Sequence, residues 1–326
     1  MENRENNIVV LSMGDPGGIG PEVVIKALNV LEGSRAIVVG DIAVLREAAP
    51  MAGMETQLRE ITSVSEALFE RGVINVVNLG VAGPTVKCRA TAEGGRASAA
   101  YIEKAAQLVM QGQDRALVTA PISKEALNLA GIGYPGHTEM LAHLTGTTDY
   151  AMMLVGGPLR VILVTTHTAL KNVPGLITRN RVLSAIRLAA RAARMLSIDA
   201  PKITVAGLNP HAGEAGLFGD EEIVSIATAV ADAVAEGIGV TGPHPPDTIF
   251  TRAYKSEVDV VVCMYHDQGL IPLKMIAFDR GVNLTIGLPI VRTSPDHGTA
   301  YDIAWQGVAS PGSMVEAIRM AERMRP

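Results

Sequence analysis

Short apolar runs alternate with longer amphipathic segments along most of this chain. Six of these runs are typical of buried strands and cover residues 7–13, 35–41, 115–121, 160–167, 202–211 and 258–267. Segments with helical spacing lie between them, for example 95–112 and 178–197. Strands that are apolar throughout and are separated by helices are typical of parallel sheets with both faces covered. The pattern therefore predicts an α/β protein with a largely parallel sheet.

The length and charge of the chain limit its size class and its partners. A chain of 326 residues can bury one large core or two ordinary ones, and composition marks no boundary between two lobes. The net charge of −5 and the aromatic content of 3% argue against a nucleic-acid partner. We expect any phosphate to be bound by a local pocket with a few cationic groups.

The sequence predicts a cytoplasmic protein that does not enter a membrane. Its N-terminus carries acids and amides where a signal peptide has a cationic start. No apolar run approaches the roughly 18–20 residues that span a bilayer. The two cysteines, Cys88 and Cys263, offer neither a disulfide framework nor a cysteine-rich metal site.

Three of the seven histidines, His167, His211 and His266, come just after predicted strands. In open α/β sheets, ligands bind beyond the carboxyl ends of the strands. Imidazole is a good ligand for divalent metals, and three protein ligands with an open position are typical of catalytic sites. One such histidine is more often a surface or capping residue, but three at equivalent positions favour a metal site.

Other predicted loops add polar side chains. They are His137 and Thr138 in "YPGHTE", Asp247 in "PPDTIF", and Asn283, Arg292, Asp296 and His297 in the segment 281–304. Lys274 and Arg292 are the cationic candidates for an anionic substrate, although a single Lys or Arg is usually a solvated surface residue. Lys274 follows the apolar "GLIPL", which favours a functional role.

The glycine-rich stretch "MGDPGGIGPEVV" joins a predicted strand to a predicted helix at residues 13–24. Its glycines do not follow the G-x-G-x-x-G spacing of dinucleotide-binding folds, and no Gly-Lys-Ser/Thr follows as in a phosphate-binding P-loop. A loop of this kind either admits an anion at the helix N-terminus or is only a tight strand-to-helix turn. No standard dinucleotide fingerprint is present in the chain.

Taken together, several motifs carry a family resemblance. "MGDPGGIGPE", "TAPISKEAL", "YPGHTEML", "VTTH", "LNPHAGE", "MYHDQGLIPLK" and "GVNLTIGLPIVRTSPDHGTAYDIA" make the chain similar to the 4-hydroxythreonine-4-phosphate dehydrogenase family of pyridoxal phosphate biosynthesis. That family is related to isocitrate and isopropylmalate dehydrogenases, which residues 14–22 and 297–300 resemble. The resemblance implies two α/β/α domains with a cleft between them. The first would cover about 1–130 plus 268–326 with NAD-binding segments, and the second about 131–267 with metal and substrate loops and dimer contacts.

The resemblance also implies a set of site residues. His167, His211 and His266 would bind one divalent metal per active site (Zn, Mg, Co or Mn), with ligands drawn from both subunits of a homodimer. The substrate would contact His137, Thr138, Lys274, Asn283 and Arg292. NAD or NADP would contact Gly287, Leu288, Pro289, His297, Gly298, Thr299 and Ala300. Lys274 would donate a proton, and Asp247 or Asp267 would act as a base or orient a ligand.

The implied reaction is the oxidation of 4-phosphohydroxy-L-threonine to a β-keto acid, which loses CO2 to give 3-amino-2-oxopropyl phosphate. A paralogous branch oxidises 4-phospho-D-threonate or 4-phospho-D-erythronate. Residues 149–162 are similar to that branch, whereas "GLIPLKMIAFDRGVN" is closer to the vitamin-pathway enzymes. Two further hypotheses are a zinc hydrolase that uses the three histidines and a non-catalytic sensor of a phosphorylated acid.

Overall fold

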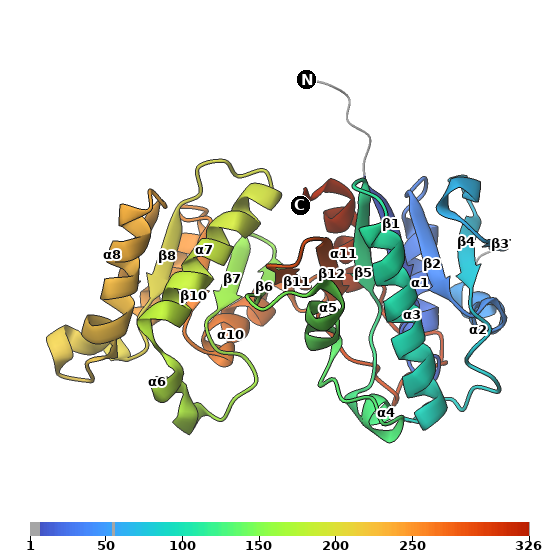
Figure 1. Cartoon of the computed structure of the whole chain (residues 1–326), viewed down its shortest axis with the longest axis horizontal. Helices are drawn as coiled ribbons and strands as arrows, with labels where there is room; N and C mark the ends of the chain where they lie inside the picture. Colours follow the sequence, from blue (N-terminus) through green and yellow to red (C-terminus); the bar gives the residue numbers. More distant parts are fainter. Residues whose placement is uncertain (1–6, 54–55, 326) are drawn as a thin grey trace. The chain divides into compact units, whose positions relative to one another are not determined.

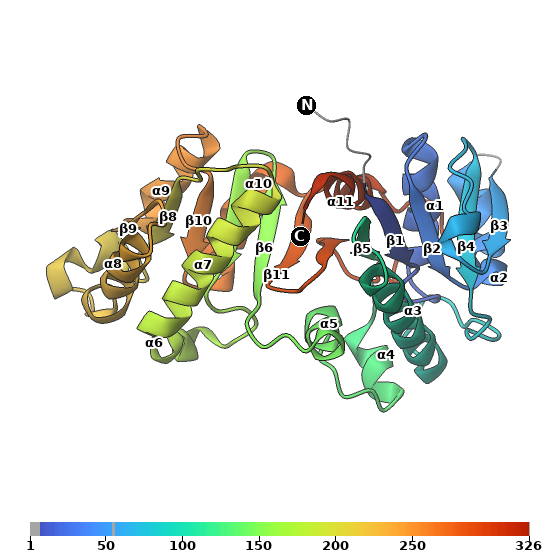
Figure 2. The same cartoon turned by 45° about the horizontal axis from the view of Figure 1, so that its top comes forward.

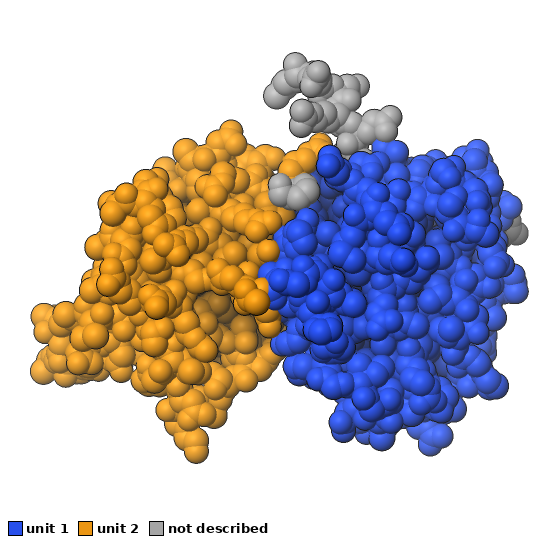
Figure 3. Space-filling model, in the orientation of Figure 1, with its two compact units in different colours: residues 1–147, 288–324, 326 blue, residues 148–287, 325 orange. Residues whose placement is uncertain are grey.

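The computed structural model describes residues 7–53 and 56–325 and forms two compact units (Figure 3). The first unit contains residues 7–53, 56–147 and 288–324, and the second contains 148–287 and 325. Two separate stretches of the chain therefore build the first unit, and one continuous stretch builds most of the second.

The first unit contains a sheet with the strand order β3-β4-β2-β1-β5-β12. All of its strand pairs are parallel. The strands are β1 (Ile8–Ser12), β2 (Ala36–Gly40), β3 (Gln57–Ile61), β4 (Val73–Asn78), β5 (Arg115–Thr119) and β12 (Val291–Pro295). Every residue of β1, β2 and β12 is buried, as expected for strands covered on both faces.

Helices cover the sheet of the first unit on both sides (Figures 1 and 2). Helix α3 packs on β1, β2 and β5, whereas α11 packs on β12, β5 and β1 and also contacts α1. The helices are α1 (Gly20–Val30), α2 (Ile42–Ala48), α3 (Ala92–Met110), α4 (Lys124–Leu129), α5 (His137–Thr145) and α11 (Gly312–Arg323), with short 3-10 turns η1 (Ala49–Ala52) and η2 (Val64–Glu66).

The second unit has the strand order β11-β6-β7-β10-β8-β9. Its strands are β6 (Ala151–Gly156), β7 (Leu159–Leu163), β8 (Ile203–Ala206), β9 (Val240–His244), β10 (Val260–Cys263) and β11 (Val282–Ile286). Strands β7, β10, β8 and β9 are parallel to one another, whereas β6 pairs antiparallel with both β7 and β11. The predicted largely parallel α/β architecture is confirmed, with β6 as the exception.

The second unit is also layered. Helix α7 lies over one face of the sheet, and α10 lies on the other (Figures 1 and 2). Leu270 and Leu273 of α10 and Ile249 of α9 form one buried cluster with Val161 and Val261 of the strands. The helices are α6 (Val173–Leu176), α7 (Arg179–Met195), α8 (Ala227–Ala235), α9 (Pro246–Tyr254) and α10 (His266–Ala277), with short turns η3 (Leu170–Asn172), η4 (Pro210–Gly216) and the π-helical η5 (Glu222–Ile226).

The units divide after residues 147 and 287, whereas the sequence-based division lies near 130 and 267. Helix α5 thus belongs to the first unit, and α10 with β11 belongs to the second. The reason is packing, because α10 contacts β6, β7 and β10, and β11 pairs with β6. Within residues 7–53 and 56–325, no helix is long and apolar enough to cross a membrane.

Candidate active site

The three candidate metal ligands follow three adjacent strands of the second unit. Strands β7, β10 and β8 are neighbours and parallel, so their carboxyl ends lie at the same edge of the sheet. His167 follows β7, His266 follows β10, and His211 follows β8. The topology thus brings loops that are distant in sequence to one edge, where ligands of α/β proteins bind.

His167 and His266 are brought together. Their ring centroids lie 5.5 Å apart, with the ring planes tilted by 43°. In a tetrahedral site, a metal–nitrogen distance of about 2.0–2.1 Å puts the centroids of two ligating imidazoles about 5 Å apart. Nδ1 of His266 is also hydrogen-bonded to Oδ1 of Asp267 at 2.7 Å, which leaves Nε2 to bind a metal. The spacing of the two rings therefore matches that of two ligands of one divalent ion, and metal binding stays a prediction.

His211 is not part of that pair within one chain. Among the described residues, no three His, Cys, Asp or Glu side chains gather closely enough to hold a metal ion. The shared site of three histidines therefore stays a prediction, and the resemblance assigns its ligands to two subunits. The exposed ring of His211 packs near Phe218, with centroids 6.4 Å apart.

An unusual backbone carries His211. Five successive residues, 211–215, have φ between 44° and 80°, so the chain makes a left-handed turn there. Only Gly213 among them lacks a Cβ, and each of the others costs about 1–2 kcal/mol in this region. Surrounding contacts must hold such a turn, and strained backbone of this kind is often found at functional sites.

Arg292, which is buried, and His137, which is partly exposed, form a polar corner in the first unit. Arg292, on β12, is only 3% exposed, and its Nη2 donates to Thr119 Oγ1 on β5 at 2.7 Å. Burial lowers the pKa of Arg292 to about 10 and Glu139 partly offsets this, so the side chain stays cationic at neutral pH. Burial, and to a smaller extent the charge of Arg292, lower the pKa of His137 well below 6.5. A hydrogen bond with the Ala120 backbone acts in the opposite direction.

The neutral imidazole of His137 completes this corner. Its Nε2 atom is buried and has no hydrogen-bond partner among the described residues. A buried polar atom of this kind normally has a protein, water or ligand partner. The corner therefore combines a cation with an available imidazole, which suits an anionic group.

The remaining predicted substrate and catalytic residues lie on several elements. Thr138 follows His137 in α5, and Asp247 is exposed in the first turn of α9. Lys274 is half-buried on α10, eight residues after His266, the first residue of that helix. Asn283 lies on β11, where its Oδ1 is buried without a partner in the described part of the chain. Lys274 and Asn283 thus belong to the same unit as the three histidines.

The chain matches the family model "Pyridoxal phosphate biosynthetic protein PdxA" over residues 32–321. It belongs to the PdxA family. The match contains all three candidate metal ligands and all the predicted substrate residues.

Two groups of relatives in the PdxA family have different names. A D-threonate 4-phosphate dehydrogenase of Pectobacterium atrosepticum is 46% identical, covering 98% of this chain and 99% of the relative. A 4-hydroxythreonine-4-phosphate dehydrogenase of Beijerinckia indica is 49% identical, covering 97% and 95%. Identity to each group is therefore almost equal.

Solved structures agree with this membership. The crystal structure of a 4-hydroxythreonine-4-phosphate dehydrogenase from Klebsiella pneumoniae has a TM-score of 0.92, with 46% identity and 99% coverage of both chains. A β-decarboxylating dehydrogenase from Thermococcus kodakarensis, at 17% identity and a TM-score of 0.52, covers 96% of this chain and 81% of its own. This second likeness concerns the fold alone.

One of the expected cofactor segments of this PdxA-family chain meets the glycine-rich loop. Ile19 N donates to Thr299 O at 3.0 Å, and a Cβ on Gly18 would lie 3.0 Å from Thr299 Cβ and from its carbonyl oxygen. Glycine therefore suits this approach, because a side chain there would push Thr299 away by a few tenths of an ångström. The buried carboxyl group of Asp15 accepts from Tyr301 Oη at 2.7 Å, and burial raises its pKa. Thr299 thus lies beside the N-terminus of α1, where its carbonyl oxygen accepts from the backbone N–H of Ile19.

The other expected cofactor segment, residues 287–289, marks the change from the second unit to the first. Gly287 has φ +110°, and a Cβ there would lie 2.3 Å from Asp149 O. Leu288 is buried and Pro289 is exposed. The glycine is required by the local backbone, and a contact with NAD stays a prediction.

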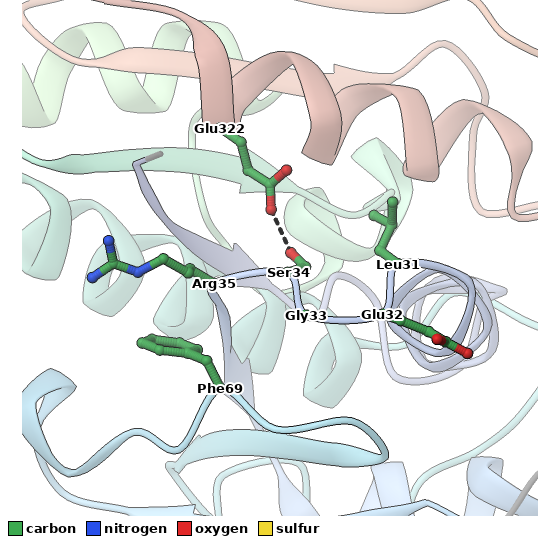
Figure 4. Close-up of a pocket in the computed structure, with 7 residues that line it drawn as sticks. All are labelled: Leu31, Glu32, Gly33, Ser34, Arg35, Phe69 and Glu322. Atoms are coloured by element: carbon green, nitrogen blue, oxygen red, sulfur yellow. Dashed lines mark hydrogen bonds between the residues drawn. The ribbon is translucent and has the colours of Figure 1, made fainter. Parts of the chain in front are cut away.

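A pocket elsewhere in the first unit contains none of the predicted site residues (Figure 4). It lies at the amino end of β2, where Arg35 stacks over the ring of Phe69 at 5.5 Å and Ser34 donates to Glu322 at 2.6 Å. In open α/β sheets, ligands bind at the opposite, carboxyl ends of the strands. We assign no role to this pocket.

Sequence reasoning missed three polar residues that support the site of this PdxA-family chain. Thr119 contacts Arg292, while Gln268 and Glu222 are buried beside the histidine loops. Glu222 ends the acidic run "GDEE", which resembles an exposed surface segment. Asp267, the neighbour of Gln268 in sequence, is exposed, so only the fold shows which of these two polar residues is buried.

Proposed function

We propose that this chain is an NAD-dependent or NADP-dependent dehydrogenase that requires a divalent metal. Its substrate is 4-phosphohydroxy-L-threonine, and the product, 2-amino-3-oxo-4-phosphooxybutanoate, decarboxylates to 3-amino-2-oxopropyl phosphate. The observation that carries the proposal is the His167–His266 pair with Asp267 on His266, found in a chain with full-length dehydrogenase relatives. Those relatives support a dehydrogenase over a zinc hydrolase.

The proposed reaction has two balanced steps. In the first, the C3 hydroxyl loses its proton and C3 transfers a hydride to the nicotinamide, which forms the ketone. In the second, the C1–C2 bond breaks, CO2 leaves, and the electron pair at C2 takes up a proton. A bound divalent ion would act as a Lewis acid for the hydroxyl and for the ketone oxygen.

Residues of the second unit have separate tasks in this proposal. Asp267 keeps the Nδ1 proton of His266 and so directs Nε2 towards the metal position. The ammonium of Lys274 supplies the proton that C2 takes up after CO2 leaves. Asp247, exposed at the start of α9, is the candidate base for the hydroxyl proton.

The polar corner of the first unit has the chemistry for the anionic groups of the substrate. Arg292 offers a guanidinium held by Thr119, and planar donors match phosphate or carboxylate oxygens. His137 is neutral at physiological pH because its pKa is lowered, so it adds a polar contact without further positive charge. Thr138 adds a hydroxyl from the same turn of α5.

D-threonate 4-phosphate is the second candidate substrate, because relatives of that name are 46% identical over nearly the whole chain. The two substrates differ at C2, which carries an amino group in one and a hydroxyl group in the other. Both contain the C3 hydroxyl and the 4-phosphate, so the same residues would serve the oxidation of either.

We further propose that the chain acts as a homodimer. On α10, Leu270, Leu273 and Ala277 face the core, whereas Ile271 and Met275 are 59% and 81% exposed, and Phe278 just beyond the helix is 77% exposed. A stripe of large apolar side chains is typical of an interface. A second copy is the expected occupant, since the metal would then take ligands from two subunits and His211 need not meet the His167–His266 pair in its own chain.

The test is a side-by-side assay of NADH formation with both substrates, with Zn²⁺ or Co²⁺ added and then removed by a chelator. We expect metal-dependent NADH formation and one CO2 released per NADH with 4-phosphohydroxy-L-threonine. A higher kcat/KM for D-threonate 4-phosphate would transfer the assignment to the second candidate. Absence of NADH formation with either substrate would contradict the proposed function.

A further inference from the structure

We propose that Gln268 and Glu222, together with Thr165, form a buried hydrogen-bonded frame that positions the three histidine loops for metal binding. The inference rests on the proposed metal-dependent function. None of these three residues is a proposed ligand, substrate contact or acid–base group. Each is buried, with exposed fractions of 4% for Thr165, 3% for Glu222 and 7% for Gln268.

Gln268 links the His266 loop to the His211 loop. Its Oε1 accepts from Met264 N at 2.6 Å, two residues before His266. Its Nε2 donates to Gly207 O at 2.7 Å, four residues before His211. Both ends of one amide side chain therefore bind backbone just beyond the carboxyl ends of β10 and β8. A buried side chain with both polar ends satisfied is held in one orientation.

Thr165 links the His167 loop to Met264, the residue that Gln268 also binds. Its Oγ1 donates to Met264 O at 2.7 Å, and its backbone N–H donates to the same oxygen at 3.2 Å. Thr165 lies two residues before His167. The backbone of Met264 is thus bound at both polar groups, because its carbonyl oxygen accepts from Thr165 and its N–H donates to Gln268. The loops of His167 and His266, whose rings lie together, are thus joined at their bases.

Glu222 fixes the left-handed turn that carries His211. Its Oε1 accepts from the N–H groups of Leu208 and Asn209, each at 2.7 Å, and its Oε2 accepts from Asn209 Nδ2 at 3.0 Å. The turn also packs closely on this carboxylate, because a Cβ on Gly213 would lie 2.8 Å from Oε2. The carboxylate has three donors, as a buried charge requires.

The position of these bonds distinguishes a positioning role from general stabilisation. Each bond ends on a residue between a strand end and a histidine. Gln268 near the start of α10 and Glu222 in η5 supply the bonds to the His211 loop. Loss of one bond should therefore move a ligand before it unfolds the unit. Groups that orient metal ligands typically change metal affinity by 10–100-fold when they are replaced.

The first measurement is Co²⁺ affinity of the full-length metal-free protein, followed by visible absorbance, for Glu222→Ala and Gln268→Leu. We expect affinity to fall about 10–100-fold in each variant. Hydrogen exchange of the metal-free protein gives a readout independent of metal, and we expect the amides of Leu208 and Asn209 to exchange faster in Glu222→Ala. If Glu222→Ala does not fold, Glu222→Gln keeps Oε1 as acceptor and loses only the Asn209 side-chain bond, so its affinity should fall by a smaller factor.

Two buried controls separate positioning from stability. Thr204 on β8 is fully buried, and its hydroxyl has no hydrogen-bond partner in the described chain, so Thr204→Val should leave Co²⁺ affinity unchanged. Val261→Ala removes core packing from β10 and should lower the unfolding temperature without changing Co²⁺ affinity.

The outcomes separate the inference from the function on which it rests. Wild-type Co²⁺ affinity in a folded Glu222→Ala or Gln268→Leu variant would overturn the frame, as would an equal loss of affinity in Val261→Ala. Absence of Co²⁺ binding by the wild-type protein would instead overturn the proposed metal dependence, and the positioning role would fall with it.

Discussion

Nδ1 of His266 lies 2.7 Å from Oδ1 of Asp267, the next residue in the chain. A carboxylate only accepts hydrogen bonds, so the imidazole donates from Nδ1 and keeps the lone pair of Nε2 for a ligand. His266 is the first residue of α10, and its ring lies against that of His167. Two neighbouring residues therefore set the tautomer of one candidate metal ligand.

Replacement of Asp267 tests this relationship. Asp267→Ala removes the acceptor, and we expect the affinity for Zn²⁺ or Co²⁺ to fall about 10-fold or more, as is typical when the orienting partner of a ligand is lost. Metal titration of the purified protein gives the affinity. Asp279→Ala, which removes an exposed acid just beyond α10, is the matched control and should bind metal normally. An equal loss in both variants would mean that overall charge alone matters.

Replacement of Arg292 tests the anion-binding corner. Arg292→Ala removes a buried cation held by Thr119, and we expect KM for the phosphorylated substrate to rise about 30-fold or more, which corresponds to about 2 kcal/mol. Arg292→Lys keeps the charge without the planar fork and should recover part of this loss. Steady-state kinetics with varied substrate and with varied NAD measure both effects. An unchanged KM in Arg292→Ala would remove this residue from the substrate site.

Replacement of Lys274 tests the second step of the proposed reaction. Lys274→Met keeps a chain of similar length without the ammonium, and we expect turnover to fall about 10²-fold or more through loss of a general acid. Metal content should stay normal, since Lys274 is not a proposed ligand. Rapid-quench analysis shows whether the β-keto acid accumulates. Lys255→Met, at an exposed position after α9, should be neutral. Normal turnover in Lys274→Met would exclude the role in catalysis.

The lowered pKa of His137 should make the stability of the protein depend on pH. Its folded pKa lies well below 6.5, so below about pH 6.5 the unfolded chain binds a proton that the folded chain does not. The free energy of unfolding is therefore not reduced by His137 above that pH. It falls as the pH decreases towards the folded pKa, by up to about 1.4 kcal/mol per pH unit. We expect His137→Gln to show a smaller loss of unfolding free energy between pH 6.5 and 5, measured by urea unfolding.

His244 supplies the comparison for this measurement. Its pKa is also lowered by burial and by Arg252, but not as far as the pKa of His137. We therefore expect His244→Gln to change the pH slope in the same direction and by less. A slope in His137→Gln that equals the wild-type slope would contradict the neutral state of His137.

The sequence alone determined the α/β class and the position of the histidines just beyond strands. Apolar runs such as 258–264 have one stable place, a strand covered on both faces, and a polar residue that follows such a run must lie at the strand end. The motif around His266 and the segment up to Ala304 also carried the family resemblance, which the match over residues 32–321 confirmed. The strand patterns and the family motifs depend on residues that are neighbours in the chain, so the sequence alone shows them.

The tertiary structure decided which strands are neighbours and which polar residues are buried. Strand order β7-β10-β8 brings the three histidine loops to one edge, and no local pattern encodes that order. Glu222 and Gln268 have ordinary polar surroundings in sequence, yet both are buried because backbone groups from distant loops satisfy them. Arg292 is likewise buried on β12, because β5 supplies the hydroxyl of Thr119. Long-range partners determine the cost of burying a polar group, and only the folded chain specifies them.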